Sequence, residues 1–186
     1  MPLSPLAPAT FPDLPVIEGV TFATAAAGVK YEDRADVMLA LLTPGSTIAG
    51  VFTKSSTRSA NVLDCQAKLG GDPSGPAAIF VNSGNSNAFT GKYGTRSVTA
   101  IANAISATTG VDINRVFTSS TGVIGEPLPH DKIIAKIDEL NTSQTGGGIS
   151  DAARAIMTTD TFAKGSSREI TIDGKTVKIA GIAKGS

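Results

Sequence analysis

The strongest constraint on the fold is that the apolar residues before residue 95 come only in short runs. The runs are bounded by glycine, proline and serine, are rich in Val, Ile, Phe and Thr, and cover residues 20–27, 36–43, 47–53 and 77–82. Runs of this length are too short for helices and predict strands. Residues 115–118 have the same character and predict a further strand.

A helical pattern begins only in the second half of the chain. Apolar residues spaced i, i+3, i+4 and i+7 predict a helix over about 95–108, which Gly110 ends. A second helix is predicted over about 130–140, and a third over about 150–157 with Ser150 as its N-cap. Strands that come first and helices that follow favour an α/β fold of the α+β kind, a layered sandwich, over a doubly wound sheet.

The two ends of the chain have distinct patterns. Five prolines fall within residues 1–16, which disfavours helix and strand pairing and predicts an extended arm. Near the other end, Asp173-Gly174 lies between two strand-like segments and predicts a type I′ hairpin turn, because both residues accept a positive φ. We therefore expect an arm over 1–16 and a single domain over 17–186.

Composition excludes several classes of partner. Sixteen basic residues balance sixteen acidic ones, so the chain lacks the positive field that holds nucleic acid or an anionic membrane. The single cysteine, Cys65, excludes an internal disulfide and fits a reducing compartment. No apolar run approaches the roughly 20 residues that cross a bilayer, and the first basic residue is Lys30, too late for a signal peptide. We expect a soluble, cytoplasmic protein.

Several catalytic arrangements are missing from the sequence. Neither phosphate-cradling glycine motif is present, and one His with one Cys cannot build a metal cluster. His130 follows Pro129 at a predicted helix start, so we expect it to be a surface or capping residue and not the base of a triad. Cys65 has no basic partner nearby in the sequence and is expected to pack.

Two segments rich in small polar residues follow predicted strands. Residues 81–88, Val-Asn-Ser-Gly-Asn-Ser-Asn-Ala, form either a loop tied to itself by asparagine side chains or a loop whose amides face a ligand. Residues 119–125, Ser-Ser-Thr-Gly-Val-Ile-Gly, form either a plain turn after a strand or an oxyanion hole. In the second case the Thr121 hydroxyl and the Gly122 amide would be the donors, since glycine allows the backbone to approach an intermediate closely.

Two more segments lie near the C-terminal end. Residues 157–161, Met-Thr-Thr-Asp-Thr, end a predicted helix, where hydroxyls and a carboxylate often only satisfy backbone groups. Residues 181–186 contain Lys184 among small residues, and this lysine either receives a substrate carboxylate or is solvated.

Taken together, these segments resemble the α chain of the bifunctional glutamate N-acetyltransferase family, also called ornithine acetyltransferases, of arginine biosynthesis. The resemblance runs from about residue 20 to the end, in the order of the family. The matching stretches are Ala26-Ala27-Gly28-Val29-Lys30, Ala49-Gly50-Val51-Phe52-Thr53, Val81-Asn82-Ser83-Gly84-Asn85, Ser120-Thr121-Gly122-Val123-Ile124-Gly125, Ala155-Ile156-Met157-Thr158-Thr159-Asp160-Thr161 and Ala183-Lys184-Gly185-Ser186.

The resemblance implies a self-cleaving acyltransferase. Family members cut an Ala-Thr bond, and the freed Thr of the β chain is the nucleophile, with its own amine as the local base. The acetyl group passes from N-acetylornithine to this Thr and then to glutamate in a ping-pong cycle without a cofactor or metal, and some members also accept acetyl-CoA. Carried over by residue, Thr121 and Gly122 match the catalytic oxyanion-hole pair, and Thr158 and Lys184 match substrate-binding positions.

The resemblance also implies an architecture. The expected fold is a layered αββα-type sandwich shared with a β chain, like that of the N-terminal-nucleophile hydrolases but differently connected, in an α2β2 heterotetramer. The family continues beyond Lys-Gly-Ser to its cleavage site, so the nucleophile is expected outside this chain. A chain that shares its sheet with a partner is expected to expose apolar surface when isolated.

Two alternatives remain open from the sequence. The first is the subunit of a self-processing aminopeptidase, which would hydrolyse peptides with a β-chain serine. The second is a non-catalytic module that binds an amino acid in its Asn- and Gly-rich loops and needs no partner.

Overall fold

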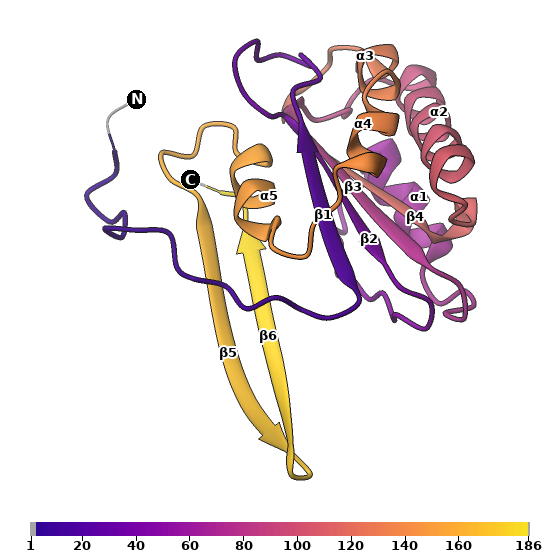
Figure 1. The fold of residues 1–186 in the computed structure, drawn as a ribbon. Coiled ribbons are helices and arrows are strands. Elements are labelled where there is room, and N and C mark those ends of the chain that lie inside the picture. The colour runs from indigo at the N-terminus through magenta and orange to yellow at the C-terminus, as the bar shows by residue number, and fades with distance from the viewer. Residues whose placement is uncertain (1–2, 186) are drawn as a thin grey trace.

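The computed structural model describes residues 3–185 and is built on one four-stranded sheet (Figure 1). Its strands are β1 (Val20–Ala25), β2 (Val37–Leu42), β3 (Ala77–Asn85) and β4 (Val116–Val123), in the order β1-β2-β3-β4. The pairs β1–β2 and β2–β3 are antiparallel, whereas β3 and β4 run parallel. The strands predicted at both ends of this sheet and in its centre are confirmed.

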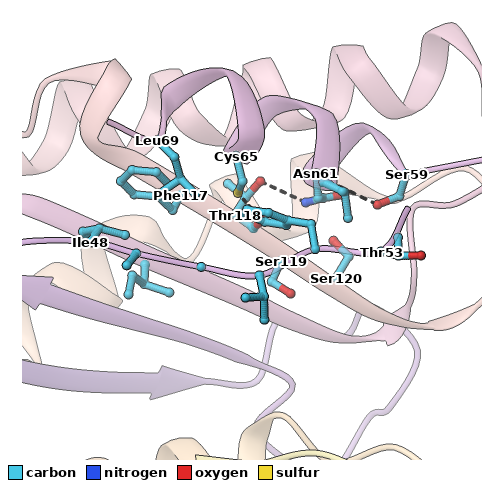
Figure 2. A pocket seen from close by; sticks show the side chains of 16 residues that line it. Ile48, Thr53, Ser59, Asn61, Cys65, Leu69, Phe117, Thr118, Ser119 and Ser120 are labelled. Atoms are coloured by element: carbon cyan, nitrogen blue, oxygen red, sulfur yellow. Dashed lines mark hydrogen bonds between the residues drawn. The ribbon is translucent and has the colours of Figure 1, made fainter. Parts of the chain in front are cut away.

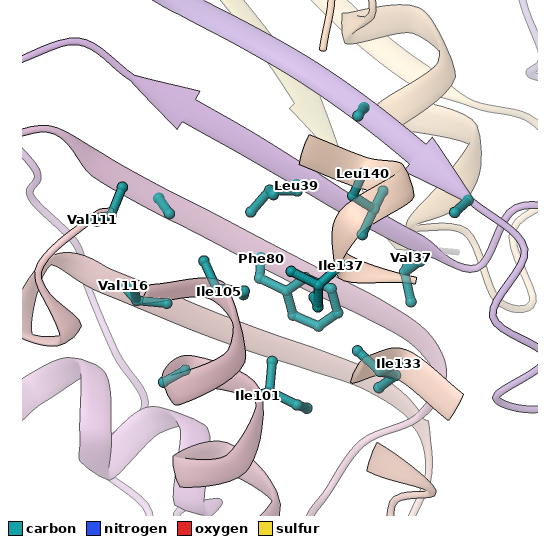
Figure 3. Close-up of a cluster of buried hydrophobic side chains, with 14 of the residues drawn as sticks. Val37, Leu39, Phe80, Ile101, Ile105, Val111, Val116, Ile133, Ile137 and Leu140 are labelled. Atoms are coloured by element: carbon teal, nitrogen blue, oxygen red, sulfur yellow. The ribbon is translucent and has the colours of Figure 1, made fainter. Parts of the chain in front are cut away.

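One face of the sheet is covered by α2 (Lys92–Thr109), α3 (His130–Ile134) and α4 (Ile137–Thr142). Helix α2 carries the predicted spacing of buried apolar residues and ends at Gly110, whose φ of 74° and N–H bond to Ser106 form a left-handed C-cap. Figure 3 shows the core between these helices and the sheet, in which Phe80 of β3 is fully buried. The other large buried side chains of this core are Leu39, Ile101, Ile105, Ile133, Ile137 and Leu140.

The opposite face of the sheet has a thinner cover. Helix α5 (Ile149–Ala155) packs on β1 and β2, where it buries Met38 and Ala40. Farther along the same face, Ile79 and Val81 of β3 are only partly buried. On this face of the sheet, β3 and β4 are therefore less covered than β1 and β2.

Helix α1 (Ala60–Lys68) had no counterpart in the sequence predictions. It packs against β4 and α2, and Ser59 caps it by accepting a hydrogen bond from the Val62 N–H. A short 3₁₀ helix, η1 (Ile113–Arg115), precedes β4.

The predicted C-terminal hairpin is confirmed and is longer than expected. Strands β5 (Lys164–Ile172) and β6 (Lys175–Ala183) pair antiparallel and extend away from the main sheet (Figure 1). Asp173 and Gly174 have φ values of 50° and 75°, as a type I′ turn requires. The hairpin exposes Ile170, Ile172 and Ile179.

Three local predictions are wrong. Residues 47–53 form no strand: Ile48 and Phe52 lie half-buried beside α1 and β4, whereas Val51 is 99% exposed, and the segment joins no ladder. The helix predicted over 130–140 is broken into α3 and α4 between Ile134 and Ile137. Helix α5 begins after Gly148, so Ser150 is not its N-cap.

The predicted mixed α/β fold is confirmed. Residues 3–16 contain no helix or strand, and they lie against the base of the hairpin. There the Ser4 N–H donates to Thr161 Oγ1, and a Cβ placed on Gly165 would lie 2.6 Å from the Phe11 ring. The boundary between arm and domain at residue 16 stays a prediction. Within residues 3–185, no helix is long and apolar enough to cross a bilayer.

Candidate active site

The candidate oxyanion pair, Thr121 and Gly122, lies on strand β4 and not in a loop. Pairing of β3 with β4 continues to Val123, with Ser83 opposite Thr121 and Gly84 opposite Gly122. The prediction that the strand stops at residue 118 is therefore wrong, because a parallel neighbour holds the following small residues extended. Thr121 is half-buried and Gly122 is exposed, so both stand at the accessible end of the strand pair.

The two strands approach unusually closely at this end. Gly122 has a φ of 139°, and a Cβ built on it would lie 2.2 Å from the carbonyl carbon of Gly84. Gly84 has a φ of 96°, and its Cβ would meet Lys30 Cβ at 2.7 Å. Side chains are thus excluded at both positions, and only glycine allows the two strands to approach so closely beside Thr121.

A buried carboxylate shapes the segment that lies over Gly84. Asp36, at the start of β2, is 0% exposed, and its two oxygens accept from the Ala27 and Val29 N–H groups at 2.7 Å each. These bonds hold residues 26–30, one of the stretches that carry the family resemblance, against the end of β3.

The asparagines of residues 82–87 bond within the protein. Asn82 Nδ2 donates to the Asn85 carbonyl at 2.9 Å and Asn82 Oδ1 accepts from Ser120 Oγ at 2.6 Å. Asn87 Nδ2 donates to Asn61 Oδ1 and to the Gly94 carbonyl at 3.1 Å each. The prediction that residues 81–88 form a loop is wrong for residues 81–85, which belong to β3. The asparagine contacts favour a structural role for the segment over the ligand-facing alternative.

The proposed substrate-binding positions meet at one buried carboxylate. Thr158 follows α5 and Lys184 follows β6, and Asp160 lies between them. Asp160 Oδ2 accepts from the Thr158 N–H at 3.2 Å, and Oδ1 accepts from the Gly185 N–H at 2.8 Å. Lys164 Nζ donates to the same Oδ1 at 2.8 Å. Thr158 and Lys184 are therefore brought together.

Asp160 is ionised under all ordinary conditions. Burial works to raise the pKa of its carboxyl, but the Lys164 ammonium and the N–H groups of Gly185 and Thr158 outweigh burial and lower that pKa to about 2. Lys184 is exposed, and it forms no ion pair with any residue in the described range 3–185.

Arg34 links this carboxylate cluster to the oxyanion pair. Its guanidinium donates to Ser83 Oγ at 3.1 Å and to the Met157 carbonyl, and it lies over the Tyr31 ring at 4.1 Å. Ser83 is the strand partner of Thr121, and its hydroxyl donates to the Ala155 carbonyl at 2.7 Å. The end of α5 is thus fastened beside the ends of β3 and β4. No sequence pattern marked Arg34 in advance.

The nucleophilic side chains that the fold places near a base are inaccessible. His130 is half-buried, not a surface or capping residue as expected, because its Nδ1 pairs with Ser97 Oγ of α2 at 3.0 Å. Ser97 is only 2% exposed, so its hydroxyl is closed to a substrate. Cys65 packs as predicted: its Sγ donates to the Thr118 carbonyl, and burial raises the pKa of its thiol.

A pocket of about 400 Å³ lies next to the oxyanion pair, between α1, residues 48–53 and β4 (Figure 2). Its walls include Phe117, Ser119 and Ser120 of β4, and on α1 Asn61 bonds Thr118 Oγ1 at 2.9 Å. None of the 16 lining residues is charged. The pocket therefore suits a neutral group and lacks partners for the ammonium and carboxylate of a free amino acid.

Comparison with known proteins decides the family. The model of the ArgJ family matches residues 21–186, nearly the whole chain. The chain belongs to the ArgJ family.

Relatives and solved structures agree with this assignment. The chain is 66% identical over 184 residues to the arginine biosynthesis bifunctional protein ArgJ of Ruegeria pomeroyi, and the match covers 99% of this chain but 45% of that protein. The protein of the same name from Agrobacterium fabrum is 46% identical over 185 residues, covering 99% of this chain and 44% of the relative. The chain thus spans about half the length of the curated ArgJ relatives that it matches.

Two solved structures share the fold. The ArgJ protein of Bacillus halodurans aligns with a TM-score of 0.82 at 33% identity, over 91% of this chain and 87% of that chain. An ornithine acetyltransferase from Mycobacterium tuberculosis, solved as a complex with ornithine, aligns with a TM-score of 0.80 at 32% identity, over 91% and 89% of the two chains. The resemblance inferred from the sequence is confirmed at the level of the ArgJ family, whereas the roles of Thr121, Gly122, Thr158 and Lys184 stay predictions.

Proposed function

We propose that this chain is the α subunit of a glutamate N-acetyltransferase that moves an acetyl group from N-acetylornithine to glutamate. One observation carries the proposal: the close parallel pairing of β3 and β4 at Gly84 and Gly122, which places the Thr121 hydroxyl and the exposed Gly122 backbone at the same strand end. Donors fixed in this way stabilise the oxyanion of acyl transfer. Membership of the ArgJ family supports the choice of this reaction over other acyl transfers.

In the proposed first half-reaction, the hydroxyl of a β-chain N-terminal Thr attacks the acetyl carbonyl of N-acetylornithine. The new C–O bond forms while the carbonyl oxygen gains negative charge, which Thr121 and Gly122 stabilise. The C–N bond then breaks, and the terminal amine of the Thr carries the proton from its hydroxyl to the leaving ornithine amine. In the second half-reaction the glutamate amine attacks the ester, and the same steps return the free hydroxyl.

Thr158 and Lys184 are the proposed substrate contacts. The exposed ammonium of Lys184 suits an α-carboxylate, which both ornithine and glutamate carry. A single carboxylate site can thus serve both half-reactions, because in a ping-pong cycle ornithine leaves before glutamate binds. The cycle needs no cofactor, because the acetyl group arrives on the amino acid; acetyl-CoA is proposed only as a second donor.

A β chain is the proposed partner. The half-buried Ile79 and Val81 on the thinly covered sheet face, together with the exposed isoleucines of the hairpin, offer apolar surface for a second sheet layer. The relatives are about twice as long as this chain, which leaves room for such a partner in one precursor. We propose an α2β2 assembly in the cytoplasm.

The test is acetyl transfer by the protein expressed from the full gene. The Thr121→Val variant removes one oxyanion donor and is expected to lower kcat by about 10²–10³-fold without preventing folding. Thr108→Val, at a half-buried position on α2 whose hydroxyl bonds Asp138, is the matched control and should keep full activity. Peptide hydrolysis in place of acetyl transfer would point to the aminopeptidase, and amino-acid binding by the isolated chain in calorimetry would point to the binding module.

A further inference from the structure

The two proposed substrate contacts stand on segments without regular structure. Thr158 lies between α5 and β5, and Lys184 follows the last residue of β6. Neither segment has a helix or strand ladder to fix it, so their relative position must come from other contacts.

The Asp160 carboxylate is the contact that joins these segments. It accepts one hydrogen bond from each backbone, the Thr158 N–H at 3.2 Å and the Gly185 N–H at 2.8 Å. The bond to Gly185 spans 25 residues of sequence and falls next to Lys184. Because the Asp160 side chain is 0% exposed, water does not compete for these bonds.

The two lysines near Asp160, Lys164 and Lys184, have different roles. Lys164 Nζ pairs with Asp160 Oδ1 at 2.8 Å, donates to the Phe162 carbonyl at 3.3 Å and lies 4.4 Å from the centre of the Phe162 ring. The Lys164 ammonium is thereby paired with the Asp160 carboxylate. Within residues 3–185, Asp160 bonds to the Lys184 segment through the backbone of Gly185 and not through the Lys184 ammonium, which keeps its charge for a ligand.

We propose that Asp160 is a positioning residue whose hydrogen bonds join Thr158 to the Lys184 segment. This link, the Asp160 latch, makes the Thr158 hydroxyl and the Lys184 ammonium converge on the carboxylate of an α-amino acid substrate. This inference rests on the proposed function and adds to it the residue that builds the carboxylate-binding end of the site. Asp160 takes no part in bond making, because its side chain is 0% exposed and both of its oxygens accept hydrogen bonds from the protein.

The test is Asp160→Asn in the complete protein expressed from the full gene. An asparagine keeps one acceptor oxygen and loses the other, so one of the two segments is no longer held, while the size of the side chain is retained. The KM for N-acetylornithine and for glutamate is expected to rise about tenfold each with kcat within about threefold, the pattern of lost ground-state binding. Asp151→Asn, which breaks an exposed ion pair with Arg154 on α5, is the matched control and should leave both constants unchanged.

A second variant separates positioning from stability. Asp160→Asn combined with Lys164→Met removes the half-buried ammonium that the first change leaves without its ion pair, so the thermal midpoint should partly recover. The KM should stay high, because the latch remains open; recovery of KM together with the midpoint would mean that Asp160 acts through stability alone and would overturn the inference.

Hydrogen exchange gives a readout that does not depend on activity. The amides of Thr158 and Gly185 should exchange at least about tenfold faster in Asp160→Asn, because the hydrogen bonds that protect them are weakened or lost. Unchanged KM or unchanged exchange in this variant, with an active wild-type enzyme, would overturn the inference and leave the proposed function standing. A wild-type complex that transfers no acetyl group would refute the proposed function itself.

Discussion

Replacing Gly122 by alanine tests whether the fold requires the close approach of the parallel strands β3 and β4. The added methyl group would lie 2.2 Å from the Gly84 carbonyl carbon and 2.5 Å from both the Asn85 nitrogen and the Gly84 oxygen. All three are backbone atoms of the neighbouring strand, so no side chain can rotate away. The strands would have to separate at the end that carries the proposed oxyanion pair.

Two costs add up in this variant. A φ of 139° strains any residue with a Cβ by about 1–3 kcal/mol, and the clash adds about 1–3 kcal/mol of overpacking. Gly125→Ala is the matched control, because Gly125 also has a positive φ, 86°, but a Cβ there meets nothing within 4 Å. The control should therefore cost only the conformational strain, about 1–2 kcal/mol.

The assay is urea and thermal unfolding of both variants in the complete protein at one scan rate. We expect Gly122→Ala to be less stable than Gly125→Ala by about 1–3 kcal/mol, the clash alone. Equal stability of the two variants would show that the strands accommodate a methyl group, and the close approach of β3 and β4 would then have no structural significance.

Two further predictions concern stability. The pKa of Asp160 is lowered from 3.8 to about 2, so its interactions stabilise the folded state by about 2.5 kcal/mol above pH 5, and this increment is lost as the pH falls towards 2. The thermal midpoint of Asp160→Asn should accordingly fall less between pH 6 and pH 3 than that of the wild type; parallel curves would contradict the assignment. Asn87→Ala leaves Asn61 Oδ1 and the Gly94 carbonyl without their buried donor and should cost about 2–4 kcal/mol in urea unfolding, whereas a cost below about 0.5 kcal/mol would show that these bonds contribute little.

Elements with strong periodicity or strong turn chemistry could be predicted from the sequence. Helix α2 has a complete apolar stripe and a glycine cap, and the hairpin has an Asp-Gly turn that fixes its register. Both signals are local, so tertiary contacts only extended these elements. The same reasoning failed for residues 47–53, an apolar run that pairs with no strand and leaves Val51 exposed.

Helix α1 and the end of β4 were missed for a related reason. Helix α1 has few buried residues, Asn61 and Cys65, so its stripe was too weak to stand out. The small residues 119–123 look like a loop, yet parallel pairing with β3 keeps them extended. In both cases a neighbour distant in sequence decides the local structure.

The candidate site could be predicted only through the family resemblance. The positions of Thr121, Gly122, Thr158 and Lys184 come from matched stretches, and spacing alone left plain structural roles open for each segment. Asp160 was visible in the sequence as a carboxylate expected to satisfy backbone groups, which it does, but its bond to Gly185 depends on the return of β6. Arg34 reaches Met157 across more than a hundred residues, and no local pattern predicts such a contact.

The central claim is that this chain stabilises an acyl transfer whose nucleophile lies on a second chain. The most direct measurement is the intact mass of each chain of the protein expressed from the full gene, after brief incubation with N-acetylornithine. We predict two chains, the second beginning with Thr and heavier by one acetyl group, with this chain unmodified. A single uncleaved chain, or an acetyl group attached to this chain, would contradict the account.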